Sequence, residues 1–491
     1  MGINIDRWEF EEHEYAEAGR RLRENLEALA RLLQRDDFGA GETSLGAELE
    51  MSIVGRDAHV MPGNGTVLER ALNPQWQLEI DCFNLEYNLA PVAAAGSPFS
   101  AMQAELEQAL EAIAGTAAEL DGRILPIGIV PTLEQAELQS DAMTDLPRYR
   151  ALAAGLRRIR QEDFRIRIDG AEPLDTTFDS VTIEGANTSF QLHLRVDPRD
   201  FAKRYNAAQL VTPLALAVAA NSPFLLGHEL WDETRIALFK QSVDTRGRSS
   251  YEWRRAARVP FGHGWIREGA WELFAESCHL YPIVIPLHSD ERPLDVLAAG
   301  GVPELLELRL QQGTIWNWNR PVYDAAGGGH LRIELRSLPS GPTPIDMLAN
   351  AAFLVGLTIG MSERIGRLLP ALPFRYAEYN FYRAAQRGLD AELLWPDLDE
   401  SSPVPRPVAA LCAELLPVAD EGLAMLGVAA GERARYLGVI GERLERGISP
   451  ARWQRRALHR LDGRQRPEAL AELVEEYLAN VATGLPIARW S

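Results

Sequence analysis

The spacing of hydrophobic residues changes twice along the chain, and these changes predict three segments. Within residues 1–40, leucines at positions 22, 26, 29 and 33 recur at helical spacing, which predicts an N-terminal helix. Residues 41–370 combine short alternating stretches with helical ones, whereas residues 371–491 are rich in Ala, Leu, Glu and Arg. The pattern therefore predicts a leading helix, an α+β body and a helical C-terminal region.

The helices and turns of the body are delimited by Pro, Gly and Asn residues. Helices are predicted over residues 97–120, 198–220 and 344–369. The second ends at Asn221-Ser222-Pro223, because a proline disfavours helical geometry at the residue before it. A short strand is predicted over 124–130, a hairpin over 181–196, and a hairpin turn at Gly327–Gly329.

Four segments alternate apolar and polar residues, as strands with one buried face do. These segments are residues 45–54, 83–89, 189–196 and 330–336. Residues two apart on a strand lie on the same face. The predicted polar faces carry Glu48, Glu50 and Ser52; Asn84, Glu86 and Asn88; Ser189, Gln191, His193 and Arg195; and His330, Arg332, Glu334 and Arg336.

The second of these strands has a break in its alternation. Glu79 and Asp81 fall out of register with Glu86, and a bulge or turn near Cys82 would explain the shift. Either of the two earlier carboxylates therefore competes with Glu86 for a place on the polar face.

Two interpretations of the polar faces remain open at this point. An antiparallel sheet often has one face in water, and its polar residues then simply point outward. However, Glu48 and Glu50 share a face without a basic partner on their own strand, and like charges repel unless a cation or a proton intervenes. Several carboxylates with one imidazole suit Mg²⁺ or Mn²⁺. Arg332 and Arg336 would add guanidinium groups for phosphate, as in a site for a metal–nucleotide complex.

Composition and charge exclude several classes of protein. The 491 residues contain 50 Lys and Arg against 70 Asp and Glu, a net charge of −20, which argues against sequence-independent nucleic-acid binding and against anionic lipid surfaces. The three cysteines are too far apart for a disulfide framework. Because no signal peptide and no 18-residue apolar run is evident, a cytoplasmic location without a membrane partner is expected.

Four short runs resemble the carboxylate–amine ligases of the glutamate–cysteine ligase type 2 family, which are related to glutamine synthetase. Gly46-Ala47-Glu48-Leu49-Glu50 resembles the G-x-E-x-E strand of the family, and residues 332–337 are similar to the R-I-E-x-R segment of glutamine synthetase. Residues 219–224 resemble an A-N-S-P segment, and residues 190–194 resemble a strand with a central histidine. The resemblance covers about residues 43–370.

This resemblance implies a glutamine synthetase-like curved antiparallel sheet with flanking helices, whose concave polar face holds two or three divalent cations and ATP. It implies metal ligands at Glu48, Glu50, Glu86, His193 and Glu334, with Glu79 and Asp81 as rivals of Glu86. Arg332 and Arg336 would contact phosphate, with Arg336 and Glu334 catalytic. Gln191 stands where the family more often has a histidine and is assigned to the cofactor site. Arg320 is a further candidate anion contact.

The function implied by the resemblance is ATP- and Mg²⁺-dependent amide formation through an acyl phosphate, with glutamate and cysteine as the family's default substrates. The expected partners are small-molecule amino acids or amines, and a homo-oligomer is compatible with the sequence. Two alternatives remain. One is a metal-independent hydrolase in which Glu48 or Glu50 acts together with Glu334. The other is a non-catalytic nucleotide-binding module.

Overall fold

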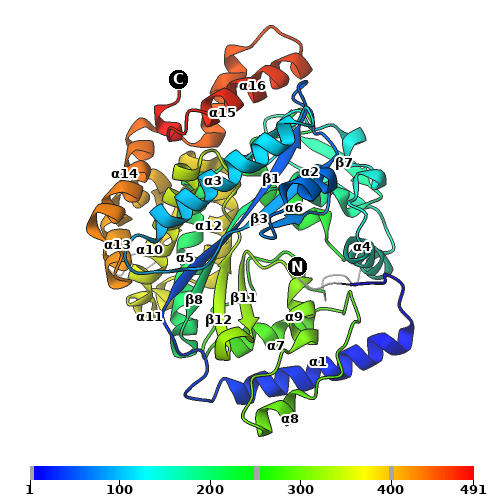
Figure 1. Ribbon diagram of the computed structural model, residues 1–491. Helices are drawn as coiled ribbons and strands as arrows, with labels where there is room; N and C mark the ends of the chain where they lie inside the picture. Colours follow the sequence, from blue (N-terminus) through cyan, green and yellow to red (C-terminus); the bar gives the residue numbers. More distant parts are fainter. Residues whose placement is uncertain (1–4, 248–254, 397–402) are drawn as a thin grey trace.

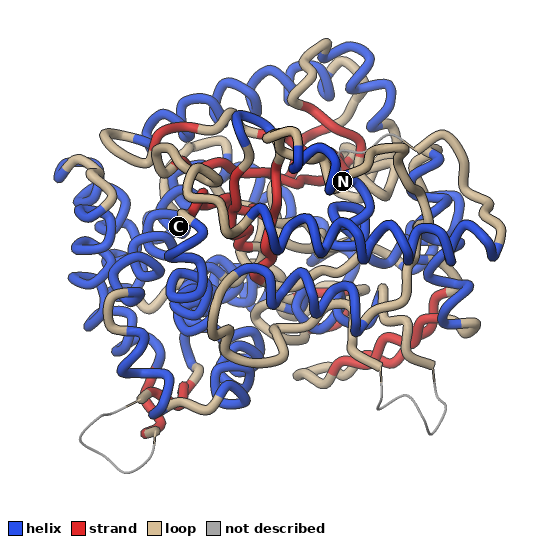
Figure 2. Tube along the Cα trace, turned by 90° about the horizontal axis from the view of Figure 1, so that it is seen from below, coloured by secondary structure: helices blue, strands red, loops and turns tan. Residues whose placement is uncertain are grey.

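An antiparallel sheet forms the centre of the computed structural model, which describes residues 5–247, 255–396 and 403–491. The sheet is curved, and helices surround it (Figures 1 and 2). Its strands follow the order β11-β12-β8-β1-β3-β2, while β4 and β5 pair with the two ends of β1. The strands are β1 (Ser44–Val54), β2 (Trp76–Leu78), β3 (Asn84–Asn88), β4 (Val92–Ala93), β5 (Arg123–Leu125), β8 (Phe190–Val196), β11 (Asn319–Asp324) and β12 (His330–Leu335).

The register of the sheet places the predicted polar faces side by side. Glu50 lies opposite Glu86 on β3, and Glu48 lies opposite Gln191 on β8. On the other edge of β8, His193 lies opposite Glu334 of β12. Since directly opposed residues share a face, the polar residues of four strands form one continuous surface.

The opposite face of the sheet is apolar and belongs to the main hydrophobic core. Its side chains include Leu49, Leu194 and Ile333, each fully buried. Helix α5 (Phe201–Ala219) contacts β11, helix α10 (Pro344–Ser362) contacts β8, and the two helices contact each other. Helix α10 is long and apolar enough to cross a membrane by length and composition, but 94% of its apolar window is buried inside the fold. It is therefore a core helix of this structure.

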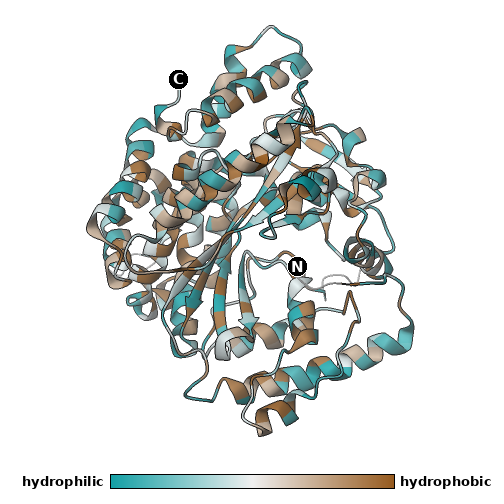
Figure 3. Cartoon of the chain, in the orientation of Figure 1, coloured by the Kyte–Doolittle hydropathy of each residue, from teal (hydrophilic) through white to brown (hydrophobic). Residues whose placement is uncertain are grey.

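Further helices and hairpins complete the fold around this core. On the surface helices α1 and α16, hydrophilic and hydrophobic residues alternate along the turns (Figure 3). The remaining elements are α1 (Glu12–Leu32), α2 (Asn64–Ala71), α3 (Pro98–Ala118), α4 (Pro147–Arg160), α6 (Thr234–Ser242), α7 (Ala270–Leu280), α8 (Pro293–Ala298), α9 (Leu306–Gly313), α11 (Ile365–Leu368), α12 (Phe374–Arg387), α13 (Val408–Met425), α14 (Ala430–Arg446), α15 (Pro450–Arg460), α16 (Arg466–Val481), β6 (Phe164–Ile168), β7 (Leu174–Phe178), β9 (Phe224–Leu225), β10 (His228–Glu229), β13 (Glu392–Trp395) and β14 (Val404–Pro407).

The predicted hairpin over residues 181–196 is wrong in its first half. Residues Val181–Ala186 form a 3₁₀ turn, η3, because tertiary contacts fix this segment locally. The Thr182 hydroxyl donates to the Leu138 carbonyl, and Gly185 packs against Asp81. The turn at Gly327–Gly329 is confirmed, since it joins β11 to β12. The turn near Cys82 is also confirmed, since it joins β2 to β3.

One other prediction is wrong in part, and the C-terminal region, which is helical as predicted, has one addition. Only Arg123–Leu125 of the strand predicted over 124–130 pairs with the sheet. The C-terminal region also contains a hairpin, β13–β14, whose second strand carries prolines that can sit only at an edge.

Helices α10 and α13 pack closely, and glycines allow this contact. A Cβ atom built on Gly422 of α13 would lie 2.0 Å from the Gly356 carbonyl oxygen and 2.5 Å from the Gly360 nitrogen of α10. Both neighbours are backbone atoms of a buried helix, so neither can move away without repacking of the core.

We expect Gly422→Ala to lower the free energy of unfolding by about 1–3 kcal/mol through overpacking. Gly438→Ala, in the middle of α14 with open space around the position, is the matched control and should stabilise by up to about 1 kcal/mol. Denaturant unfolding of both variants tests the contact, and equal stability of the two would contradict it.

Candidate active site

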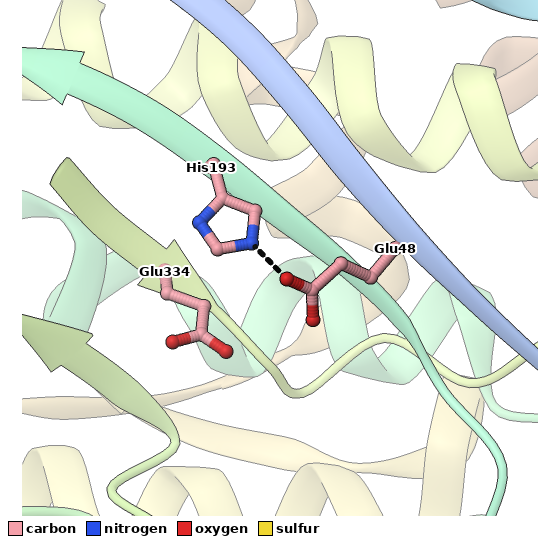
Figure 4. A group of neighbouring side chains, drawn as sticks. All are labelled: Glu48, His193 and Glu334. Carbon is pink, nitrogen blue, oxygen red and sulfur yellow. Dashed lines mark hydrogen bonds and ion pairs between the residues drawn. The ribbon is translucent and has the colours of Figure 1, made fainter. Parts of the chain in front are cut away.

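Three side chains from three adjacent strands meet on the polar face of the sheet (Figure 4). They are Glu48 of β1, His193 of β8 and Glu334 of β12, and one potential ligand atom from each lies within 4.8 Å of the others. His193 Nε2 lies 3.0 Å from Glu48 Oε1, whereas its Nδ1 has no partner within the described structure. Two carboxylates and one imidazole at this spacing form a donor set that fits a divalent cation.

Two arginines bind the Glu334 carboxylate at the same time. Arg320 donates from Nε at 2.5 Å and from Nη2 at 2.9 Å, and Arg336 donates from Nη1 at 2.6 Å. Burial raises the pKa of Glu334, but the two guanidinium groups outweigh it and hold the pKa far below the ordinary value. Glu334 is therefore ionised at neutral pH despite being fully buried.

Glu50 and Gln191 link the three-residue group to the rest of the polar face. The Glu50 carboxylate accepts from the Ser189 backbone N–H at 2.7 Å, the Ser189 hydroxyl at 2.8 Å and Gln191 Nε2 at 2.7 Å. Gln191 in turn accepts a hydrogen bond from Arg336. Gln191, assigned to the cofactor from the sequence, thus connects Glu50 with the guanidinium group that holds Glu334.

A cavity of about 80 Å³ opens beside these residues. Its walls carry five carboxylates and two guanidinium groups together with apolar and aromatic side chains: Glu48, Glu50, Glu79, Glu86, Glu184, Arg320, Arg336, Gln191, Ile80, Tyr149, Leu152, Val243, Gly313 and Trp316. Both Glu79 and Glu86 reach this cavity. Asp81 instead lies fully buried against Gly185.

Three further carboxylates that line the cavity have raised pKa values. Burial raises the pKa of Glu86 to about 7, and the neighbouring Glu48 and Glu50 contribute. Burial and the proximity of Glu86 raise the pKa of Glu79 well above its ordinary value. Burial, then Glu50, raises the pKa of Glu184 to about 8. Negative charge is therefore in excess on this side of the cavity, and a cation would relieve it.

Arg332 lies next along β12 but outside the three-residue group. It donates to Asp324 at 2.8 Å and contacts His330 at 3.1 Å. With Arg309 and Gln312 it lines a second cavity, of about 140 Å³. Arg320 and Gly313 line both cavities, so the two cavities adjoin.

Sequence reasoning underestimated Arg320 and missed Glu184. The turn at Gly327–Gly329 would have placed Arg320 opposite Glu334, since β11 and β12 are paired through it. Glu184 lies in the segment that was incorrectly predicted as a hairpin strand, so the pattern did not place it on the polar face. Arg235 was missed as well: it is buried, donates to the Leu338 carbonyl at 3.1 Å and lies 3.2 Å from Glu233. No periodic pattern in the sequence around Arg235 indicates that its side chain is buried.

We expect Glu86→Gln to stabilise the metal-free protein, and to do so more at pH 8 than at pH 5. The folded-state pKa of about 7 lies above the ordinary 4.5, so wild-type stability falls as the pH rises between these values. The amide of the Glu86→Gln variant does not ionise, so the variant avoids this loss of folding stability, which is at most about 3 kcal/mol. Thermal unfolding in a chelator at both pH values measures the gain. Glu111→Gln, exposed on α3, is the control, and a gain that does not change with pH would refute the expectation.

A family model and two similar proteins all indicate the same family. The family model of glutamate–cysteine ligase family 2 (GCS2) matches residues 44–476. A protein of Trichormus variabilis, provisionally assigned as glutamate–cysteine ligase 2, is 24% identical over 67% of this chain and 79% of its own length. A Frankia alni protein, provisionally assigned as glutamate–cysteine ligase 2-1, is 27% identical over 61% of this chain and 64% of its own length, which is just under two thirds.

Two solved structures are also similar at low identity. One is the glutamate–cysteine ligase of Francisella tularensis in complex with AMP, with a TM-score of 0.49, 11% identity and coverage of 91% of this chain and 94% of that one. The other is a bifunctional glutathione synthetase from Pasteurella multocida, with a TM-score of 0.47, 12% identity and coverage of 94% and 55%. The family match, which spans most of the chain, is decisive: the chain belongs to glutamate–cysteine ligase family 2 and is a carboxylate–amine ligase.

Proposed function

We propose that this protein uses Mg-ATP to join a carboxylate to an amine through an acyl phosphate, with glutamate and cysteine as the first substrates to test. The observation that carries the proposal is the group of Glu48, His193 and Glu334, with Arg320 and Arg336 holding Glu334. It combines a donor set for a divalent cation with guanidinium groups for phosphate on one surface.

The residues present fit the cations that this chemistry needs. Glu48, His193 and Glu334 would hold one divalent cation, and Glu50 and Glu86, with Glu79 beside them, would hold a second. Bound divalent cations neutralise the negative oxygens that come together when a phosphoryl group moves to a carboxylate. The raised pKa values of Glu79 and Glu86 agree with this assignment, since both burial and mutual repulsion disfavour their charged forms without a cation.

The arginines would act on the groups being transferred. Arg336 lines the cavity between Glu334 and Gln191, where it can stabilise charge on the transferring phosphoryl group and on the acyl phosphate. Arg320 and Arg332 border the second cavity, which suits the remaining phosphates of the nucleotide. Their fixed partners, Glu334 and Asp324, keep the guanidinium groups in place before the substrate arrives.

The hydrolase alternative lacks a proton donor in the pair Glu48 and Glu334. A glycosidase acid needs a raised pKa. Burial raises the pKa of Glu48, but His193 outweighs this effect and the pKa lies below the ordinary value. The pKa of Glu334 is also lowered, so both carboxylates are ionised at neutral pH. Burial raises the pKa of Glu50, so the pair Glu50 and Glu334 is the version of this alternative that keeps a candidate acid.

We expect Glu48→Gln and Glu334→Gln each to reduce ATP-dependent phosphate release by at least about 100-fold, the scale seen when one essential electrostatic group is removed. Phosphate release with Mg-ATP and a panel of amino-acid pairs, with mass spectrometry of the products, measures this. Glu111→Gln should behave as wild type. Normal turnover in both site variants would refute the proposal. ATP binding by the wild type without product formation from any pair would favour the non-catalytic alternative.

We also expect Mn²⁺ to bind the protein without nucleotide, and Glu48→Gln to weaken this binding by about 10-fold or more. Electron paramagnetic resonance of free Mn²⁺ during a titration measures the affinity directly. Unchanged affinity in Glu48→Gln, with wild-type secondary structure by circular dichroism, would remove Glu48 from the metal site.

A further inference from the structure

Glu184 lines the catalytic cavity from a loop rather than from the sheet. It belongs to η3 (Val181–Ala186), which precedes β8, and it shares the cavity with Glu50 and Arg336. Glu50 accepts three hydrogen bonds, whereas the described residues donate none to the Glu184 carboxylate. Glu184 therefore presents a carboxylate to the cavity without a fixed partner.

The backbone around Glu184 is held in place by contacts on both sides. A Cβ atom on the neighbouring Gly185 would lie 2.4 Å from Asp81 Oδ2, so only glycine allows η3 to approach the β2–β3 turn this closely. The Thr182 hydroxyl donates to the Leu138 carbonyl at 2.6 Å, and the Ser180 hydroxyl accepts from the Thr182 N–H at 3.3 Å. These contacts fix the position of the segment and preorganise it for a ligand.

The cavity beside Glu184 has an apolar wall as well as a charged one. The wall consists of Ile80, Leu152, Val243 and Trp316. The charged wall includes the Glu184 carboxylate, which can form an ion pair with a cationic group that enters the cavity. Together, these features suit a ligand with a positive group and a small apolar body.

Building on the proposed function, we propose that Glu184 binds the ammonium group of the incoming amine substrate beside the apolar wall, and so selects cationic primary amines as acceptors. The reaction brings together a carboxylate and an amine that is protonated in solution. In the proposed function Glu48, Glu50, Glu79 and Glu86 would be occupied by the cations, and the arginines by Glu334 and phosphate. The Glu184 carboxylate is the cavity-lining group that remains for the ammonium.

The test compares a charged acceptor with an uncharged one. Hydroxylamine is neutral at pH 7 and converts an acyl phosphate to a hydroxamate, so it reports carboxylate activation without an ammonium group. In Glu184→Gln we expect hydroxamate formation from L-glutamate and Mg-ATP to fall much less than the reaction with the amine. The KM for L-cysteine, or for the amine that the substrate panel identifies, should rise at least about 10-fold, the scale of a hydrogen bond to a charged group.

The controls separate this inference from the function on which it rests. Glu184→Asp should recover part of the amine affinity, and Glu111→Gln should change neither reaction. Equal loss of both reactions, an unchanged KM for the amine, or weaker Mn²⁺ binding in Glu184→Gln would overturn the role of Glu184. Absence of hydroxamate from every carboxylate in the wild type would instead overturn the proposed function, and this inference with it.

Discussion

The site depends on the cost of burying several carboxylates on one face of a sheet. A buried carboxylate is stable only when a cation, a proton or hydrogen-bond donors compensate its charge. The buried carboxylates of this protein are compensated in two ways. Arg320 and Arg336 neutralise Glu334, whereas no arginine of the described residues forms an ion pair with Glu79 or Glu86, and burial raises the pKa values of both. At one end of the cavity the chain itself neutralises the charge of Glu334. At the other end the charges of Glu79 and Glu86 are neutralised by what binds there.

The curved sheet makes this arrangement possible because its register is fixed from both sides. Strand β1 pairs with β8 and β3 along its length, and with β4 and β5 at its ends. A slip of one residue would bring Leu49 to the polar face and both neighbouring glutamates into the core. The buried helices α5 and α10 beneath the sheet oppose such a slip, because their close packing leaves no space for charged side chains.

The sequence allowed the polar face to be predicted, since alternation by itself defines which residues share it. Glu48, Glu50, Glu86, His193 and Glu334 were named in this way, and the register brings them together. Residues outside regular strands were harder to place. Glu184 lies on a 3₁₀ turn fixed by contacts with distant segments, and Arg235 donates to the Leu338 carbonyl from a helix. Such positions depend on tertiary contacts that no local periodicity reveals.

The glycine contact between α10 and α13 determines whether the C-terminal region of this ligase can be lost. Helix α13 belongs to the C-terminal region, whereas α10 follows the strand that carries Glu334. Because Gly422 approaches the backbone of α10 directly, the C-terminal region is part of the same core as the catalytic sheet. Deletion of that region would expose a nearly continuous apolar helix to water. Relatives that lack an equivalent of α13 would therefore need another apolar element to cover α10.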